Sequence, residues 1–183
     1  MDVIVISSSP NTDGLTAACA AAAVEGVLQA GGQVEEIRLN DLQVGMCQAC
    51  DDGWGTCLPD HKCQLEDDFQ AVHARALAAD AYVLVTPVYW GEMSETAKAF
   101  TDRLRRCEAT RDREGGLFNK AVISVAAAGG SGNGMITCLL SQERWIEHVQ
   151  ARKFDLIPVN RSSREYKLVA IREAARTMAQ EAM

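Results

Sequence analysis

The sequence contains neither a long hydrophobic run nor an excess of positive charge. No stretch approaches the roughly 20 apolar residues that a membrane-spanning helix requires. The N-terminal MDVIVISSSP enters a strand-like run without a basic leader, so we expect no secretory signal and a cytoplasmic protein. The formal net charge of −7 over 183 residues argues against nonspecific binding to nucleic acid or to an anionic membrane surface.

Repeats and low-complexity linkers are also lacking, which predicts a single domain over residues 1–183. Short apolar segments alternate with longer amphipathic ones along the whole chain. The expected strands are Val3 to Ile6, Val34 to Leu39, Ala81 to Thr86 (ended by Pro87), Ala121 to Ala128 and Phe154 to Val159. The expected helices are Leu15 to Ala30, Asp67 to Ala79, Ser94 to Arg106 with Ser94 as N-cap, Met135 to Gln150, and one from Arg164 onward. This alternation predicts an α/β fold, a five-stranded parallel sheet with helices on both faces that forms a three-layer sandwich.

Parallel sheets of this kind bind ligands beyond the carboxyl ends of their strands. The loop after the first strand, Ser7 to Thr16, offers hydroxyls and the free amides of a helix N-terminus, which together suit an anion. It lacks both the glycine fingerprint of dinucleotide sites and the Gly-Lys-Ser/Thr of nucleotide P-loops. The loop therefore suits a terminal monophosphate better than a pyrophosphate, and a simple helix-capping turn is the alternative.

Two further loops at the same edge have unusual compositions. After the third strand, Tyr89, Trp90 and Gly91 could line a flat heteroaromatic ring. After the fourth, the glycine-rich stretch 129–134 would let the backbone approach a ligand closely. The alternatives are aromatic packing at a domain edge or subunit interface, and a plain flexible loop.

Together these loops resemble the NADPH-dependent FMN reductase family, which has a flavodoxin-like fold. The resemblance is carried by residues 6–10 with Thr16, 86–91, 98–103 and 129–132. It implies that FMN is the cofactor, that NAD(P)H is the electron donor, and that the protein is a homodimer or homotetramer. It places Ser9, Asn11 and Thr16 at the FMN phosphate, with Ser7 and Leu15 beside them, and Pro87, Val88, Tyr89, Trp90, Gly91, Gly129, Gly130 and Ser131 at the isoalloxazine ring.

The resemblance has two departures in the first loop. Asn11 stands where many relatives have arginine, and Leu15 stands where asparagine is common. The phosphate charge would then rest on backbone amides and the helix dipole. We expect the helix segment Lys98 to Arg103 to serve packing or a subunit interface.

Seven cysteines are present, and four of them, Cys47, Cys50, Cys57 and Cys63, are crowded into one segment. The other three are expected to be buried thiols. The crowded segment resembles the iron–sulfur flavoprotein branch of the same superfamily, although the gap between Cys50 and Cys57 is longer than that branch typically has. Four thiolates can bind a [4Fe–4S] cluster or a zinc ion, and the third alternative is that they bind no metal.

These features predict an oxidoreductase that moves hydride from NAD(P)H to FMN and on to a quinone, flavin or other small acceptor. No catalytic side chain is assigned, because the cofactor carries the chemistry. The first alternative is an iron–sulfur flavoprotein that carries electrons between a ferredoxin-like donor and FMN. The second is a non-redox domain with structural zinc. His73 and His148 fall on expected helices and are predicted to be surface residues.

Overall fold

The computed structural model describes residues 1–181 and contains a parallel five-stranded sheet. Its strands are β1 (Asp2–Ser7), β2 (Gln33–Arg38), β3 (Ala81–Tyr89), β5 (Ala121–Ala128) and β6 (Arg152–Asn160). They lie in the order β2-β1-β3-β5-β6, and each neighbouring pair is parallel. This is the strand order of flavodoxin-like sheets, whose chain reverses direction across the sheet between β1 and β3. The predicted fold class is confirmed.

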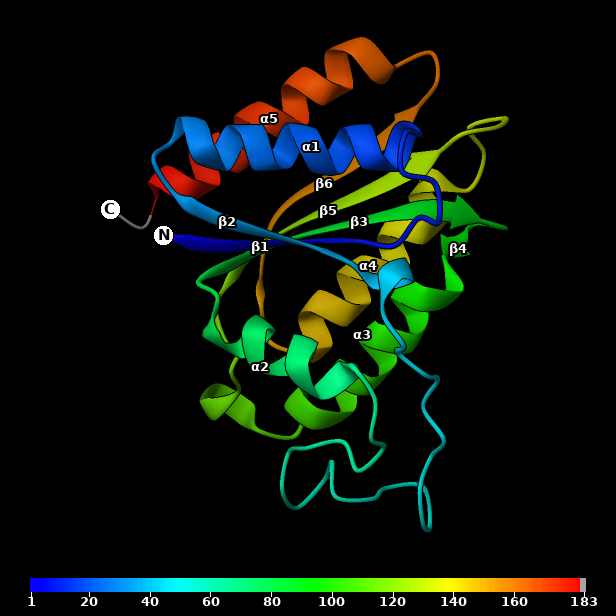
Figure 1. Cartoon of the computed structure of the whole chain (residues 1–183), viewed down its shortest axis with the longest axis vertical. Coiled ribbons are helices and arrows are strands. Elements are labelled where there is room, and N and C mark those ends of the chain that lie inside the picture. The colour runs from blue at the N-terminus through cyan, green and yellow to red at the C-terminus, as the bar shows by residue number, and fades with distance from the viewer. Residues whose placement is uncertain (182–183) are drawn as a thin grey trace.

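Helices cover both faces of the sheet (Figure 1). Helices α1 (Leu15–Gln29) and α5 (Arg164–Gln180) pack side by side on one face. Helices α2 (Phe69–Ala78), α3 (Glu95–Glu108) and α4 (Met135–His148) cover the other. Two short 3-10 helices, η1 (Leu39–Asp41) and η2 (Asp112–Glu114), lie in connections. No helix of residues 1–181 is long and apolar enough to span a bilayer.

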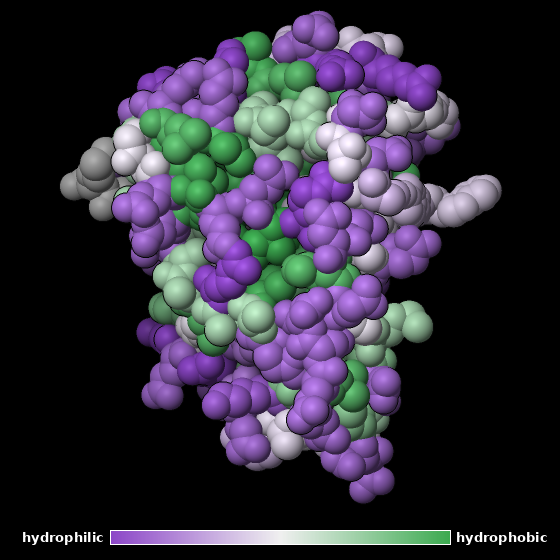
Figure 2. Space-filling model, viewed as in Figure 1, coloured by the Kyte–Doolittle hydropathy of each residue, from purple (hydrophilic) through white to green (hydrophobic). Residues whose placement is uncertain are grey.

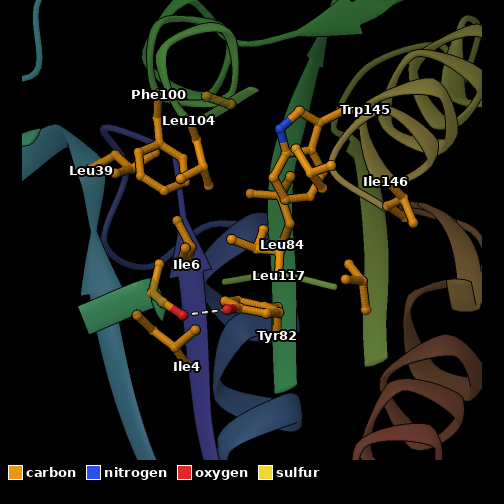
Figure 3. Packing of buried hydrophobic residues seen from close by; sticks show 14 of the residues in the cluster. Ile4, Ile6, Leu39, Tyr82, Leu84, Phe100, Leu104, Leu117, Trp145 and Ile146 are labelled. Carbon is orange, nitrogen blue, oxygen red and sulfur yellow. Dashed lines mark hydrogen bonds between the residues drawn. The ribbon is translucent and has the colours of Figure 1, made fainter. Parts of the chain in front are cut away.

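Alternation along the central strands divides the core between the two faces. In β1, Val3 and Val5 belong to the cluster under α1 and α5, whereas Ile4 and Ile6 face the α2–α4 side. Figure 3 shows that second cluster, in which the Tyr82 hydroxyl donates a hydrogen bond to the carbonyl of Ala76. Both faces of the strands are therefore apolar, as expected for a parallel sheet buried on both sides.

The structure departs from the sequence prediction at the end of β3. The strand does not stop at Pro87 but continues to Tyr89 and turns back into a short antiparallel strand, β4 (Glu92–Met93). Pro87 lies beyond the last pair between β3 and β1, which joins Val85 to Ser7. The missing N–H of proline therefore breaks no ladder hydrogen bond there.

The prediction of His73 as a surface residue is wrong. Its side chain is buried, and Nε2 lies 2.7 Å from Oε1 of Glu108, which is also buried. Burial of the Glu108 carboxylate opposes its negative charge. The contact with His73 and the hydrogen bond from the amide of Gly116 nevertheless lower the pKa of Glu108. His148 lies on the surface as predicted.

Candidate functional site

A network of hydroxyl groups joins the loops that follow β1 and β3. The amide of Ser8 donates to the carbonyl of Val85 at 3.1 Å, which continues the sheet beyond β1. The Ser94 hydroxyl lies 2.9 Å from Oγ of Ser8 and 3.0 Å from its carbonyl oxygen, and it also accepts from the amide of Ala97 as the N-cap of α3. The sequence indicated the cap at Ser94, but its bonds to Ser8, 86 residues away, had no sequence signal.

The loop after β1 ends at a helix N-terminus with free amide groups. Gly14 is the N-cap of α1 and offers no side chain to accept from the first amides, and the first turn holds no acidic residue. These amides and the positive end of the helix dipole can bind an anion. Among the predicted residues, Thr16 is buried in the first turn and the Ser9 hydroxyl accepts from the amide of Asn11 at 3.2 Å.

Two other residues predicted in this loop lie where their side chains serve the core. Ser7 is the last residue of β1 and is buried between Arg38 of β2 and Val85 of β3. Leu15 is half-buried and packs against the cluster under α1 and α5.

A pocket of about 520 Å³ opens between the β3–β4 turn and the loop that follows β5. Its volume lies within the usual range for cofactor sites. The predicted residues that line it are Val88, Trp90, Gly91, Gly129, Gly130 and Ser131. Pro87 is buried in the sheet and Tyr89 is partly exposed, and neither lines the pocket. Asn133, Gly134 and Thr137 also line it and were not predicted individually.

The wall of this pocket contains a tight turn with an unfavourable residue. Trp90 and Gly91 have φ angles of 52° and 83°, the left-handed pair of a type I′ hairpin turn. Tryptophan is a costly residue at such a position, and the Trp90 side chain is fully exposed. Strained residues of this kind cluster at ligand sites, which makes Trp90 a candidate contact residue.

Close contact with α4 fixes the position of the turn. Oγ1 of Thr137 lies 2.8 Å from the carbonyl oxygen of Gly91 and 2.9 Å from that of Gly134, within donating distance of both. A Cβ atom on Gly134 would lie 2.6 Å from Cα of Gly91. Only a residue without a side chain allows the two backbones to approach so closely.

The second unusual region is the cysteine loop, defined as residues 42–68. It leaves η1 near the carboxyl edge and runs to the lower end of the molecule in Figure 1, outside α2 and α3. It contains no helix or strand, and hydrophilic residues cover most of this part of the surface in Figure 2. Three of its non-glycine residues, Ala49, Asp51 and His61, have positive φ. A loop of this length without regular structure commonly has a function.

All seven cysteines are free thiols. Cys19, Cys107 and Cys138 are buried as predicted, and burial raises the pKa of the Cys138 thiol to about 11. Cys47, Cys50, Cys57 and Cys63 are half-buried and line one small pocket together with Arg103 and Arg106. Within residues 1–181, no three His, Cys, Asp or Glu side chains converge closely enough to hold a single metal ion. Tertiary structure thus brings the four predicted thiols to one pocket.

Comparison with known proteins finds related sequences and structures with the same fold. An iron–sulfur flavoprotein from Methanocaldococcus jannaschii is 31% identical over 134 residues, which cover 73% of this chain and 65% of that protein. The chain thus spans slightly less than two thirds of that relative. Among solved structures, a flavone reductase has a TM-score of 0.74 at 18% identity, with 100% of this chain and 63% of that chain covered. An NAD(P)H:quinone oxidoreductase from Methanothermobacter marburgensis has a TM-score of 0.70 at 18% identity, with 97% and 96% covered.

The two structural similarities show the shared fold. The model of the family described as NADPH-dependent FMN reductase matches residues 1–154, which include β1 to β5, α4 and the start of β6. The match covers the loop after β1, the pocket beside Trp90 and the cysteine loop. The resemblance seen in the sequence is confirmed: the chain belongs to the NADPH-dependent FMN reductase family.

Proposed function

We propose that this protein is an FMN-dependent oxidoreductase that takes hydride from NAD(P)H and passes electrons to a quinone, a flavin or another small acceptor. One observation carries the proposal. The free helix N-terminus after β1 and the pocket beside Trp90 lie at the same edge of the sheet, on either side of the end of β3 and next to the β1–β3 switch point where flavodoxin-like folds bind FMN.

The residues of the two loops have separate tasks in this proposal. The first amides of α1, with the Ser9 and Thr16 hydroxyls, bind one phosphate group without a basic side chain. The backbones of Gly91 and of residues 129–131 face the pocket, where they can hydrogen-bond the polar edge of a flat ring. FMN, when bound, supplies the hydride chemistry. The chain supplies binding, orientation and an open face of the pocket for a second substrate.

The identity of the flavin tests this proposal directly. Protein purified with its flavin, or loaded with an equimolar mixture of FMN and FAD, is denatured and the released flavin is identified by chromatography. We expect FMN, because the phosphate loop suits one terminal phosphate. Recovery of FAD, or no binding of either flavin at micromolar concentration, would contradict the proposal. Oxidation of NADH and NADPH with a quinone acceptor then identifies the donor.

A second candidate function is electron transfer between a ferredoxin-like donor and FMN through a [4Fe–4S] cluster in the cysteine loop. The observation that favours it is the single pocket lined by Cys47, Cys50, Cys57 and Cys63. Four thiolates that line one pocket can supply the ligands of a [4Fe–4S] cluster or of a zinc ion.

Metal analysis separates the alternatives for the cysteine loop. We expect iron and acid-labile sulfide in protein purified without oxygen, and their loss in Cys57→Ser. Stoichiometric zinc would make the site structural instead. The absence of any metal would leave an FMN reductase without a second centre.

Self-association is also part of the proposal. Ile136 and Leu140 lie one turn apart on α4 and are exposed, and Trp90 is exposed on the neighbouring turn. This apolar surface supports the homodimer or homotetramer that the family resemblance implies. Light scattering at micromolar concentration measures the mass, and a monomer would contradict this part of the proposal.

A further inference from the structure

Arg103 of α3 is buried, although it carries a charge. Its side chain is 1% exposed, and its guanidinium carbon lies 4.3 Å from the centroid of the Phe69 ring. Burying a cation costs free energy unless the surroundings supply negative charge and hydrogen-bond acceptors. The partners of Arg103 therefore indicate what this residue is placed to hold.

Every hydrogen bond found for the guanidinium leads to the cysteine loop. One terminal nitrogen donates to the carbonyl of Gly45 at 3.1 Å and to Oδ2 of Asp67 at 2.6 Å. The other donates to Sγ of Cys63 at 3.2 Å and to the carbonyl of Leu65 at 3.2 Å. Arg103 thus connects the two ends of the loop and contacts one of its four crowded thiols directly.

Asp67 completes this connection. Its carboxylate also accepts from the amide of Gly45 at 2.9 Å and from the amide of Phe69 at 3.0 Å. Although burial opposes the charge, these bonds and Arg103 hold the pKa of Asp67 below its ordinary value. The Arg103–Asp67 ion pair therefore persists at neutral pH and fixes the beginning and the end of the loop to α3.

One donor of Arg103 is left without an acceptor. Its Nε atom is buried and has no hydrogen-bond partner among the described residues. Leaving a buried donor unpaired costs about 1–3 kcal/mol. Arg103 lines the pocket that contains the four thiols, and Arg106 lines it as well. The pocket therefore combines two cations with four thiols, and this combination suits an anionic group bound through sulfur.

We infer that Arg103 is a positioning residue for a thiolate-bound metal centre in the cysteine loop and tunes its reduction potential through the bond to Cys63. This inference rests on the cluster-containing form of the proposed function. Hydrogen bonds and positive charge at a ligand sulfur stabilise the reduced, more negative form of a cluster. Arg103 thus raises the reduction potential and at the same time holds the loop in its ligand-binding shape.

The test compares variants at Arg103 with a matched variant at Arg106. Arg106 lies on the same helix, lines the same pocket, donates to the carbonyl of Gly53 and stacks on Trp54 at 4.6 Å, but no bond to a sulfur is found for it. Arg103→Lys keeps a cation that can pair with Asp67, but it cannot reproduce the planar fork that also reaches Cys63. Arg103→Gln removes the charge as well.

Two quantities are measured on anaerobically purified protein: iron and sulfide per chain, and the midpoint potential from a redox titration followed by electron paramagnetic resonance. For Arg103→Lys we expect retained iron and a lower potential. The expected shift is about tenfold in the equilibrium constant for one-electron reduction, or about 59 mV. Arg103→Gln should show an equal or larger shift, or loss of iron. Arg106→Gln removes a charge from the same pocket but no hydrogen bond to sulfur, so its potential should fall by less than that of Arg103→Gln.

Three outcomes would overturn the inference. The first is an unchanged potential in Arg103→Lys with full iron content, which would reduce Arg103 to a packing residue. The second is a shift in Arg106→Gln equal to that in Arg103→Gln, which would assign the effect to the positive charge of the pocket rather than to the bond with Cys63. The third is wild-type protein without iron and sulfide. FMN content is measured on the same samples, so failure of this inference is distinguished from failure of the flavin proposal.

Discussion

The close approach of Gly134 to Gly91 predicts that Gly134→Ala damages the flavin pocket. The φ angle of Gly134 is 78°, a conformation that costs a non-glycine residue about 1–2 kcal/mol. The added Cβ would also lie 2.6 Å from Cα and 3.0 Å from the amide nitrogen of Gly91, which are backbone atoms that cannot rotate away. Overpacking of this kind typically costs about 1–3 kcal/mol.

The two contributions sum to about 2–5 kcal/mol of lost unfolding free energy. For a chain of this size each kcal/mol lowers the melting temperature by about 2–4 °C, so the expected decrease is about 4–20 °C. Any relaxation must move the Trp90–Gly91 turn away from α4, which displaces one wall of the pocket. We therefore expect FMN affinity to fall at least about tenfold, equivalent to about 1.4 kcal/mol.

Gly130→Ala is the matched control in the same loop. A Cβ atom at Gly130 meets no atom within 4 Å, and its φ is not positive, so stability should change by less than about 0.5 kcal/mol. Its FMN affinity should nevertheless fall, because the added methyl group faces the space assigned to the ring. Thermal unfolding of the apoprotein and titration of flavin fluorescence measure the two effects. Wild-type stability in Gly134→Ala would refute the packing argument, and wild-type FMN affinity in both variants would place the flavin elsewhere.

Three further substitutions test other parts of the structure. Thr16→Ala should weaken FMN binding by a few-fold to tenfold with the fold intact. One hydrogen bond to a phosphate contributes about 1.5–3 kcal/mol, and neighbouring amides compensate in part for its loss. An unchanged dissociation constant for FMN would show that the phosphate lies elsewhere. Ser94→Ala should lower the unfolding free energy by about 1–3 kcal/mol, because it removes the N-cap of α3 and leaves Ser8 with fewer hydrogen-bond partners. Urea unfolding measures this loss, with Ser94→Thr as the control. Glu108→Gln should reduce the loss of unfolding free energy that occurs as the pH is lowered. The pKa of Glu108 is lowered in the folded protein, so its contribution is present above the unfolded value of about 4.3 and is lost as pH falls through the folded pKa. Urea midpoints between pH 7 and pH 3 check this, and parallel profiles for the variant and wild type would contradict it.

Local patterns were sufficient to predict most of the secondary structure. The apolar segments around Val3 to Ile6 and Ala121 to Ala128 have no polar face, which predicts strands buried on both sides, and these strands are found. The cap at Ser94 is also a local signal, because a serine before a helical pattern can accept from an amide three residues later. By contrast, the β3–β4 turn was missed because Pro87 was predicted to end the strand. The proline is tolerated inside β3 because the pairing of β3 with β1 has already ended at Val85, and this pairing is not visible in the sequence.

The candidate site divides in the same way. Short local motifs alone predicted which loops form the candidate flavin site and where the thiols crowd, because both are properties of short segments. Only the tertiary structure decided that Gly134 contacts Gly91, that Ser94 bonds to Ser8 and that Arg103 reaches Cys63. It also decided that His73 is buried against Glu108 rather than exposed. These contacts join residues from 35 to 86 positions apart, and such pairings depend on how helices and strands pack rather than on any local periodicity.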